Sequence, residues 1–90
     1  IISTGNIVNV VANDDKIVLL TGSGLIINLP GDPIFGQQLI IKDGAGTAAS
    51  NLVTINPPSG ITIDGSSVVV MGQNYQSFTF MWNGTEWNII

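Results

Sequence analysis

The chain has 90 residues, the length of one domain, and its six acidic and two basic residues give a net charge of −4. This balance argues against binding to nucleic acid, because a phosphate backbone is held by clustered Lys or Arg. Without His or Cys, the chain also lacks the commonest general base, the commonest metal ligand and a thiol nucleophile. We therefore expect no enzyme activity, no cofactor and no metal site.

The apolar content is high for so short a chain. Hydrophobic residues make up 44% and charged residues 9%, against about 25% charged in an average soluble domain. Several runs are apolar on both faces, without the alternation of a sheet that has one wet side. These runs are 17–20, 25–27, 39–41 and 68–71. A second apolar surface must cover them, and we expect copies of the same chain to supply it.

Short β-rich runs alternate with turn residues along the whole chain, and no helical period is visible. Gly, Pro, Asn and Asp separate the runs, as the φ angles of turns require. The sequence predicts an all-β fold, an antiparallel β-sandwich or jelly-roll-like domain of about eight short strands. The runs lie at 7–11, 16–21, 25–29, 38–43, 52–56, 61–64, 67–71, 75–82 and 85–90.

The segment 44–51 holds little that could be buried, so we expect it to be the longest and most mobile loop and a place where a ligand is met. Tyr75 starts a strand after the polar turn 72–74, on the opposite face from Phe78. An exposed Tyr is a frequent contact residue at interfaces. The candidate receptor-binding residues are Thr47, Ser50, Asn74 and Tyr75.

The sequence contains one short internal repeat, in which Val53-Thr-Ile-Asn56 is followed by the similar Ile61-Thr-Ile-Asp64. A simple hairpin across the intervening Pro-Pro-Ser-Gly would mix apolar and polar residues on each face. A bulge or a corner between two sheets resolves this conflict, and we favour the corner. Two units are too few for a solenoid of stacked repeats.

The last residues predict a β-hairpin, because Asn83-Gly84 suits a two-residue type I′ turn between two alternating runs. Counting outward from that turn pairs Met81 with Glu86 and Phe80 with Trp87. The large apolar side chains then lie on one face of the hairpin. We therefore expect both tryptophans to lie in the core and not on a sugar-binding surface. That face comprises Phe78, Phe80, Trp82, Trp87 and Ile89.

The pattern of the acidic residues does not indicate a catalytic site or a metal site. Glycoside hydrolysis needs two carboxyl groups about 5–10 Å apart. Five of the six acids instead lie in or beside turns, where Asp is expected for its local hydrogen bonds. We interpret Asp14-Asp15 as a polar turn and not a Ca²⁺ site, and Glu86 as a charge that prevents wrong strand pairing. The acids are Asp14, Asp15, Asp32, Asp43, Asp64 and Glu86.

A series of short segments, spread over nearly the whole chain, forms a recognisable order. The segments are 16–20, 27–30, 36–37, 40–43, Gly46, Ile55, 63–65, 75–77 and 82–87. In this order the chain resembles the C-terminal β-structured domains of phage tail fibres and tailspikes and the fibre heads of other viruses. The resemblance implies a homotrimer at the tip of a fibre, with a role in host attachment or trimer registration. It does not indicate which residues contact a receptor.

We therefore expect one fibre-head domain over residues 1–90, excised from a longer chain, on a virion fibre or tail tip and extracellular during attachment. Its partners would be two further copies and a cell-surface glycan or protein, with no nucleic acid and no membrane insertion. One alternative is a monomeric carbohydrate-binding module of a secreted protein. Another is a purely structural trimerisation or capsid-decoration domain.

Overall fold

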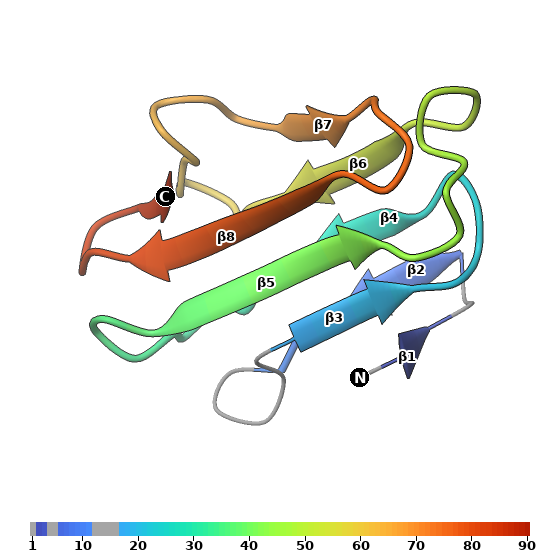
Figure 1. Ribbon diagram of the computed structural model, residues 1–90. Coiled ribbons are helices and arrows are strands. Elements are labelled where there is room, and N and C mark those ends of the chain that lie inside the picture. The colour runs from blue at the N-terminus through green and yellow to red at the C-terminus, as the bar shows by residue number, and fades with distance from the viewer. Residues whose placement is uncertain (1, 4–5, 12–16) are drawn as a thin grey trace.

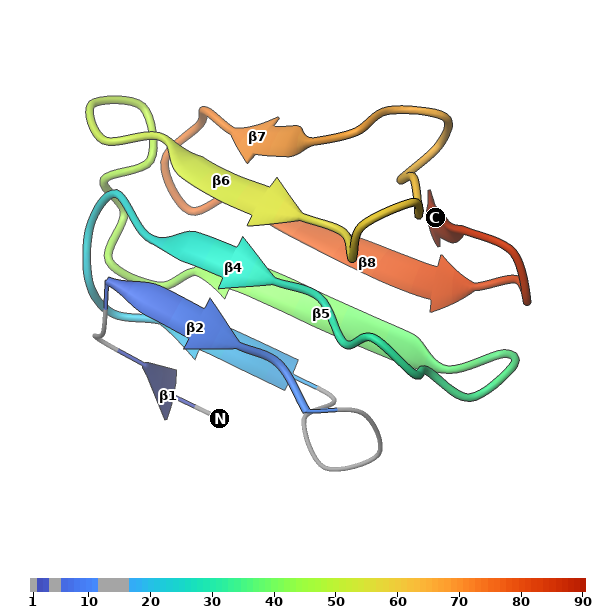
Figure 2. The same cartoon turned by 180° about the vertical axis from the view of Figure 1, so that it is seen from behind.

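The computed structural model describes residues 2–3, 6–11 and 17–90, so Asp14 and Asp15 lie outside the described residues. All regular elements of the described part are strands, and they form two sheets that face each other (Figures 1 and 2). The first sheet has the order β1 (Ile2–Ser3), β3 (Ile17–Leu20), β5 (Gln38–Asp43), β8 (Ser77–Trp82) and β9 (Trp87–Ile89). The second has the order β2 (Ile7–Asn9), β4 (Ile26–Asn28), β6 (Val53–Asn56) and β7 (Val69–Met71).

The first six strands alternate between the two sheets. Consecutive strands therefore do not pair, and β1, β3 and β5 run parallel in one sheet while β2, β4 and β6 run parallel in the other. Only the pairs β5–β8, β6–β7 and β8–β9 are antiparallel. The expected β-sandwich is confirmed, but its sheets are mixed and not antiparallel throughout, and an antiparallel jelly roll does not describe it.

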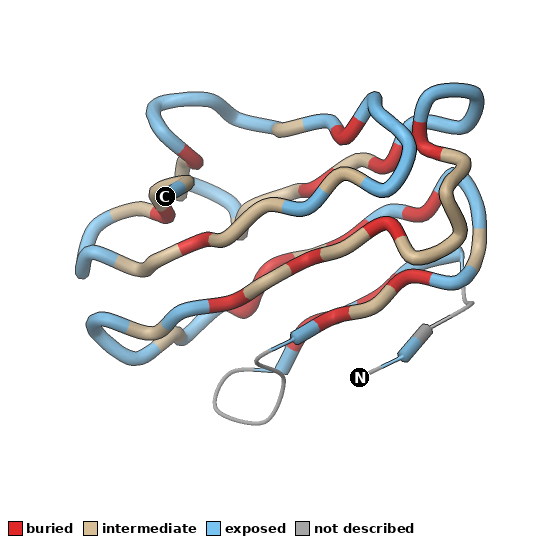
Figure 3. The backbone as a smooth tube through the Cα atoms, viewed as in Figure 1, coloured by how far each residue is buried: buried red, intermediate tan, exposed pale blue. Residues whose placement is uncertain are grey.

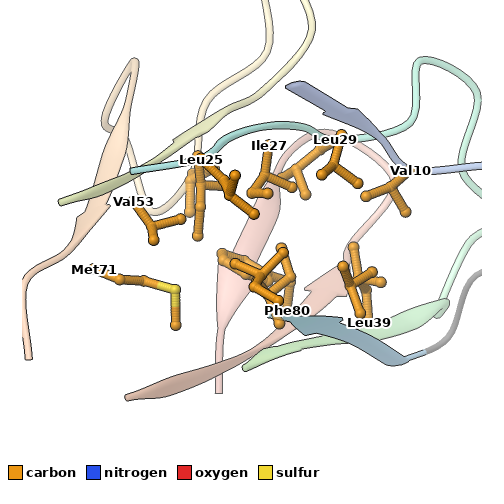
Figure 4. Close-up of a cluster of buried hydrophobic side chains, with 14 of the residues drawn as sticks. Val10, Leu25, Ile27, Leu29, Leu39, Val53, Met71 and Phe80 are labelled. Atoms are coloured by element: carbon orange, nitrogen blue, oxygen red, sulfur yellow. The ribbon is translucent and has the colours of Figure 1, made fainter. Parts of the chain in front are cut away.

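The core lies between the sheets and follows the register of the strands. Val8, Ile27 and Ile55 are neighbours across β2, β4 and β6, and all three are buried. In the facing sheet, Leu39 pairs with Phe80, and both are buried. Figure 4 shows the side chains of Ile27 from one layer and of Leu39 and Phe80 from the other pointing toward one another, and Figure 3 shows burial alternating along the strands.

The predicted corner after β6 is confirmed. The segment 61–64 forms no strand of its own, which corrects its expected strand. Instead Ile63 makes a parallel bridge with Trp87, a residue of the other sheet. The connection 57–68 between β6 and β7 is longer than the one that contains 44–51, so the expectation about the longest loop is wrong.

The terminal hairpin differs from its predicted register. Trp82 pairs with Trp87 and Met81 with Asn88, so four residues, not two, form the loop. A type I′ turn needs positive φ at both central residues, and of Asn83 and Gly84 only Gly84 has it. The Asn83 side chain closes the wider loop, since its Oδ1 accepts hydrogen bonds from the N–H groups of Thr85 (2.8 Å) and Glu86 (2.9 Å).

The shift amounts to two residues, which is the side-chain period of a strand, so every side chain keeps its predicted face. Phe80 and Trp87 are buried, and Phe78, Trp82 and Ile89 pack against the core. The prediction that both tryptophans serve the core is confirmed.

Candidate functional site

One end of the sandwich is built around Asp43, the last residue of β5. We call it the Tyr75 end and define it as the loop 44–51, the turn 72–76, Lys42 and Asp43; in Figure 1 it lies where the arrow of β5 ends. Asp43 Oδ1 accepts a hydrogen bond from the Gly46 N–H (3.1 Å), and Oδ2 accepts from the N–H groups of Ala48 (3.0 Å) and Tyr75 (3.1 Å). One fully buried carboxylate thus ties two loops together.

Two opposing effects act on the pKa of Asp43. Burial strips water from the carboxylate and raises its pKa, whereas the backbone N–H groups of Ala48, Tyr75, Gly46 and Thr47 stabilise the charged form and lower it. The net pKa lies below the ordinary value of an aspartate. Asp43 is therefore a charged structural anchor at neutral pH and not a proton donor.

Tyr75 stands out from this end in an unusual conformation. Its φ is +62°, a region that bulky residues rarely adopt, and 60% of its surface is exposed. The ring sits against Gly46, where an added Cβ would lie 2.3 Å from Tyr75 Cζ. Lys42 Nζ lies 5.6 Å from the ring centroid and donates a hydrogen bond to the Tyr75 carbonyl oxygen.

The four predicted receptor residues all lie at the Tyr75 end, although their binding role stays a prediction. Asn74 Oδ1 accepts a hydrogen bond from the Ala49 N–H (3.0 Å), which joins the two loops a second time. Thr47 O accepts from the N–H groups of Ser50 (3.1 Å) and Asn51 (2.9 Å), so the loop forms a compact turn. These hydrogen bonds hold the loop against the turn 72–76, and its expected mobility stays a prediction.

Sequence reasoning missed the residues that organise this end, namely Lys42, Asp43 and Gly46. The available signal was the spacing Asp43-Gly-Ala-Gly46, an acidic side chain followed by glycines whose N–H groups can approach it closely. From the sequence alone, this segment is predicted only as a turn between two strands.

The opposite end, which we call the Glu86 end, comprises the loop 29–37, the segment 62–66 and the hairpin loop 83–86. Glu86 does not oppose Met81, contrary to the prediction. Its Oε1 accepts hydrogen bonds from Thr62 Oγ1 and from the Gly65 N–H, both at 2.8 Å. Asp64 Oδ1 accepts from Asn88 Nδ2 at 3.0 Å. Both acids therefore brace the hairpin to the corner segment, which is a structural role.

The described residues contain no group of three or more His, Cys, Asp or Glu side chains that could hold a metal ion. Within the same part of the chain, no helix has the length and apolar character needed to cross a membrane.

The aromatic side chains divide between core and surface. Trp87 is fully buried and lies 5.6 Å, centroid to centroid, from Trp82, which packs partly against the core. Phe35 and Tyr75 are exposed at opposite ends of the sandwich. The surface a sugar or protein could meet is therefore not the tryptophan pair.

Comparison with known proteins supports the fold and the viral resemblance. The sequence matches the family described as the phage depolymerase C-terminal beta sandwich domain over residues 2–88, which agrees with the two packed sheets. None of the curated proteins compared with the sequence matches it. The family's domain is a non-catalytic, structural module of phage tail proteins and thus a component of the virion. The chain belongs to the family of phage depolymerase C-terminal beta sandwich domains.

Proposed function

We propose that this domain assembles as a homotrimer at the tip of a phage tail fibre or tailspike and attaches the virion to its host. The observation that carries the assembly part is the outward face of the second sheet, which has no charged side chain in its described strands and exposes Ile7, Ile26 and Val70. The attachment part rests on the Tyr75 end, where the candidate receptor residues gather.

The outward face of the second sheet is a continuous row across four strands. Ile7, Ile26, Thr54 and Val70 are successive neighbours in the register of β2, β4, β6 and β7. The exposed fractions are 59% for Ile7, 39% for Ile26 and 44% for Val70. No charged side chain belongs to this face in the described residues of the four strands.

Asparagines form the next row of the same face. Asn9, Asn28 and Asn56 are in register, and Asn28 Nδ2 donates a hydrogen bond to Asn9 Oδ1 at 3.0 Å. Amide groups are both donors and acceptors, so a partner that presents the same row can supply the hydrogen bonds that the remaining amides need when water is removed.

The partner that fits this face is a second copy of the chain. Covering apolar surface stabilises by about 25 cal/mol per Å². A chain with a net charge of −4 meets its own copies with least repulsion through a surface that carries no charge. The number three comes from the resemblance to fibre tips, and the face itself requires only a closed assembly, which leaves no copy of it exposed.

A lysine placed in the centre of the face tests the assembly. Ile26→Lys introduces three like charges into a closed interface, and we expect it to convert the assembly to monomers at micromolar concentration. Thr79→Lys is the matched control, because Thr79 pairs with Ile40 on the outward side of the first sheet. Sedimentation velocity measures both, and dissociation by Thr79→Lys but not by Ile26→Lys would assign the interface to the other sheet.

The attachment role is separated from a purely architectural one by removing residues 1–90 from the fibre. Loss of adsorption to host cells with intact trimeric fibres supports attachment, whereas misassembled fibres support the architectural role alone. A monomeric carbohydrate-binding module predicts quenching of tryptophan fluorescence by oligosaccharides. The buried position of Trp87 argues against that alternative.

A further inference from the structure

The backbone of Tyr75 is held in a strained conformation by its neighbours. A φ of +62° costs a non-glycine residue roughly 1–3 kcal/mol. Asp43 Oδ2 accepts its N–H, and Lys42 Nζ donates to its carbonyl oxygen. These two contacts fix both sides of the residue. The ring is thereby presented in one place before any ligand arrives, which reduces the ordering cost of binding.

Lys42 supplies a positive charge beside this ring. Of the three N–H donors of its ammonium, one is used by the Tyr75 carbonyl oxygen. Among the described residues no carboxylate forms an ion pair with it. Asp43, the next residue, is fully buried and has its charge satisfied by backbone N–H groups. Lys42 is therefore able to pair with a negative group from outside.

The accessible acids are segregated from Lys42. Asp32, Asp64 and Glu86 lie at the Glu86 end, and β5, with six residues, separates the two ends. At about 3.3 Å per residue that strand spans roughly 20 Å, more than twice the Debye length of about 8 Å at physiological ionic strength. Within the described part of the chain, Lys42 is thus the accessible charge of the Tyr75 end, whose other charged group is the buried carboxylate of Asp43.

Uncharged polar groups lie at the same end of the sandwich as the Tyr75–Lys42 pair. Asn74 Nδ2, Thr47 Oγ1, Ser50 Oγ and Tyr75 Oη have no hydrogen-bond partner among the described residues. These are amide and hydroxyl groups, which match the hydroxyl groups of a sugar as donors and acceptors. The exposed aromatic ring offers an apolar surface to the C–H groups of a sugar ring.

We propose that the Tyr75 end binds a saccharide that carries a carboxylate, with the carboxylate at Lys42 Nζ, the sugar ring against Tyr75 and its hydroxyls at Asn74 and Ser50. This inference rests on the attachment function proposed above and names its ligand class. A neutral sugar leaves the ammonium of Lys42 without a negatively charged partner, and an acidic group without a sugar leaves the Tyr75 ring and the Asn74 amide uncovered.

The test uses the 90-residue chain and an array of uronate- and sialate-bearing oligosaccharides, each beside its carboxyl-reduced counterpart. We expect at least one acidic glycan to bind about tenfold more tightly than its reduced form, because a hydrogen bond to a charged group contributes roughly 1.5–3 kcal/mol. Lys42→Gln should remove that preference and Lys42→Arg should retain it. Equal binding of acidic and reduced glycans, or no binding to the array, overturns the proposal.

The variant Tyr75→Gly tests the contribution of the Tyr75 ring to binding without disturbing the fold. Glycine adopts a φ near +60° without strain, so this variant should keep its melting temperature within a few degrees while losing glycan binding. Phe35→Ala, at the opposite exposed aromatic, is the control and should bind normally. Binding by Tyr75→Gly at the wild-type level would contradict the proposal.

Adsorption of fibres to host cells, measured with the same variants, keeps the two hypotheses apart. Loss of adsorption in Lys42→Gln and Tyr75→Gly supports the acidic-saccharide site. Normal adsorption by both variants, together with lost adsorption on removing the domain, refutes this site and leaves the attachment function standing.

Discussion

Asp43 illustrates how one buried charge can organise a loop end. It is an unfavourable residue to bury, and desolvation alone would raise its pKa, yet three backbone N–H groups converge on its two oxygens. Loop 44–51 buries one small apolar side chain, that of Ala48, so the hydrophobic effect contributes little to its order. Hydrogen bonds to a carboxylate perform that task instead, and they place Tyr75 at the same time.

The lowered pKa of Asp43 predicts acid sensitivity. A depressed folded-state pKa contributes stability above the unfolded pKa of about 4, and this contribution is lost as the pH falls through the folded value. Asp43→Asn must turn its amide nitrogen toward at least one N–H donor, and we expect it to lose roughly 2–4 kcal/mol at pH 7. Chemical unfolding from pH 7 to pH 2.5 measures this difference.

The difference in stability between wild type and Asp43→Asn should begin to narrow below about pH 4, where the unfolded carboxyl takes up a proton. It should be lost once the pH has fallen through the lower folded pKa of Asp43, because both side chains are then neutral. Asp32→Asn, at an exposed position, should change stability by less than about 0.5 kcal/mol. A gap that stays constant down to pH 2.5 would show that the charge of Asp43 does not carry the stabilisation.

Gly46 makes a second residue-scale prediction. An alanine Cβ there meets the Tyr75 ring at 2.3 Å and also has to adopt a φ of +73°. Gly60 has a φ of +81° but no atom within 4 Å of an added Cβ, so Gly60→Ala measures the backbone strain alone. We expect about 1 kcal/mol for Gly60→Ala and roughly 2–4 kcal/mol for Gly46→Ala, from thermal unfolding.

The Gly46→Ala variant should also move the Tyr75 ring, which would appear as a changed chemical shift of the Lys42 side-chain methylenes. If Gly46→Ala and Gly60→Ala destabilise the protein equally, the Tyr75 ring moves away at no cost and does not pack tightly against Gly46.

At the scale of elements, the local pattern predicted which side chains face the core better than it predicted which strands are neighbours. Alternation assigned the faces of β8 and β9 correctly even though their register is shifted by two residues. Strand order is different, because the partners of β2 and β4 are set by contacts across the sandwich and not by adjacent residues. The parallel pairing of the first six strands could therefore not be predicted from the local sequence pattern.

The corner after β6 was predictable because a hairpin there would have placed polar residues in the core. The register of the terminal hairpin was not, since Asn83-Gly84 also fits a wider loop in which Asn83 Oδ1 caps two backbone N–H groups. Likewise the candidate site residues were identified individually, but their gathering around Asp43 depends on the pairing of β5 with β8.

The Asn83 side chain should stabilise the hairpin loop by a measurable amount. Asn83→Ala removes the acceptor for two N–H groups, and we expect it to cost roughly 1–2 kcal/mol. Asn83→Asp keeps the acceptor oxygen and should cost less. Thr85→Ala is the control, because Thr85 contributes its backbone N–H to the loop, and alanine keeps that group. The loss of stability measured by urea unfolding should be smaller for Thr85→Ala than for Asn83→Ala.

If Asn83→Ala and Thr85→Ala unfold at the same urea concentration, the loop is fixed by the pairing of Trp82 with Trp87 and not by the asparagine cap.

At the scale of the whole molecule, the described surface is divided by chemistry. The outward side of the second sheet carries apolar residues and an asparagine ladder, the Glu86 end carries the accessible acids, and the Tyr75 end carries Lys42 and an exposed aromatic ring. In the assembly proposed above, copies of the chain cover a face of the sandwich and not an end, which would leave the Tyr75 end free to meet the host. The same division explains how so apolar a chain can function with 9% charged residues.

The oligomeric mass of the 90-residue chain tests the central claim most directly. Sedimentation equilibrium at micromolar concentration should give three times the 9.4 kDa mass of one chain, and Ile26→Lys should return the mass to that of one chain. A wild-type chain that sediments as a stable monomer at this concentration would contradict the account.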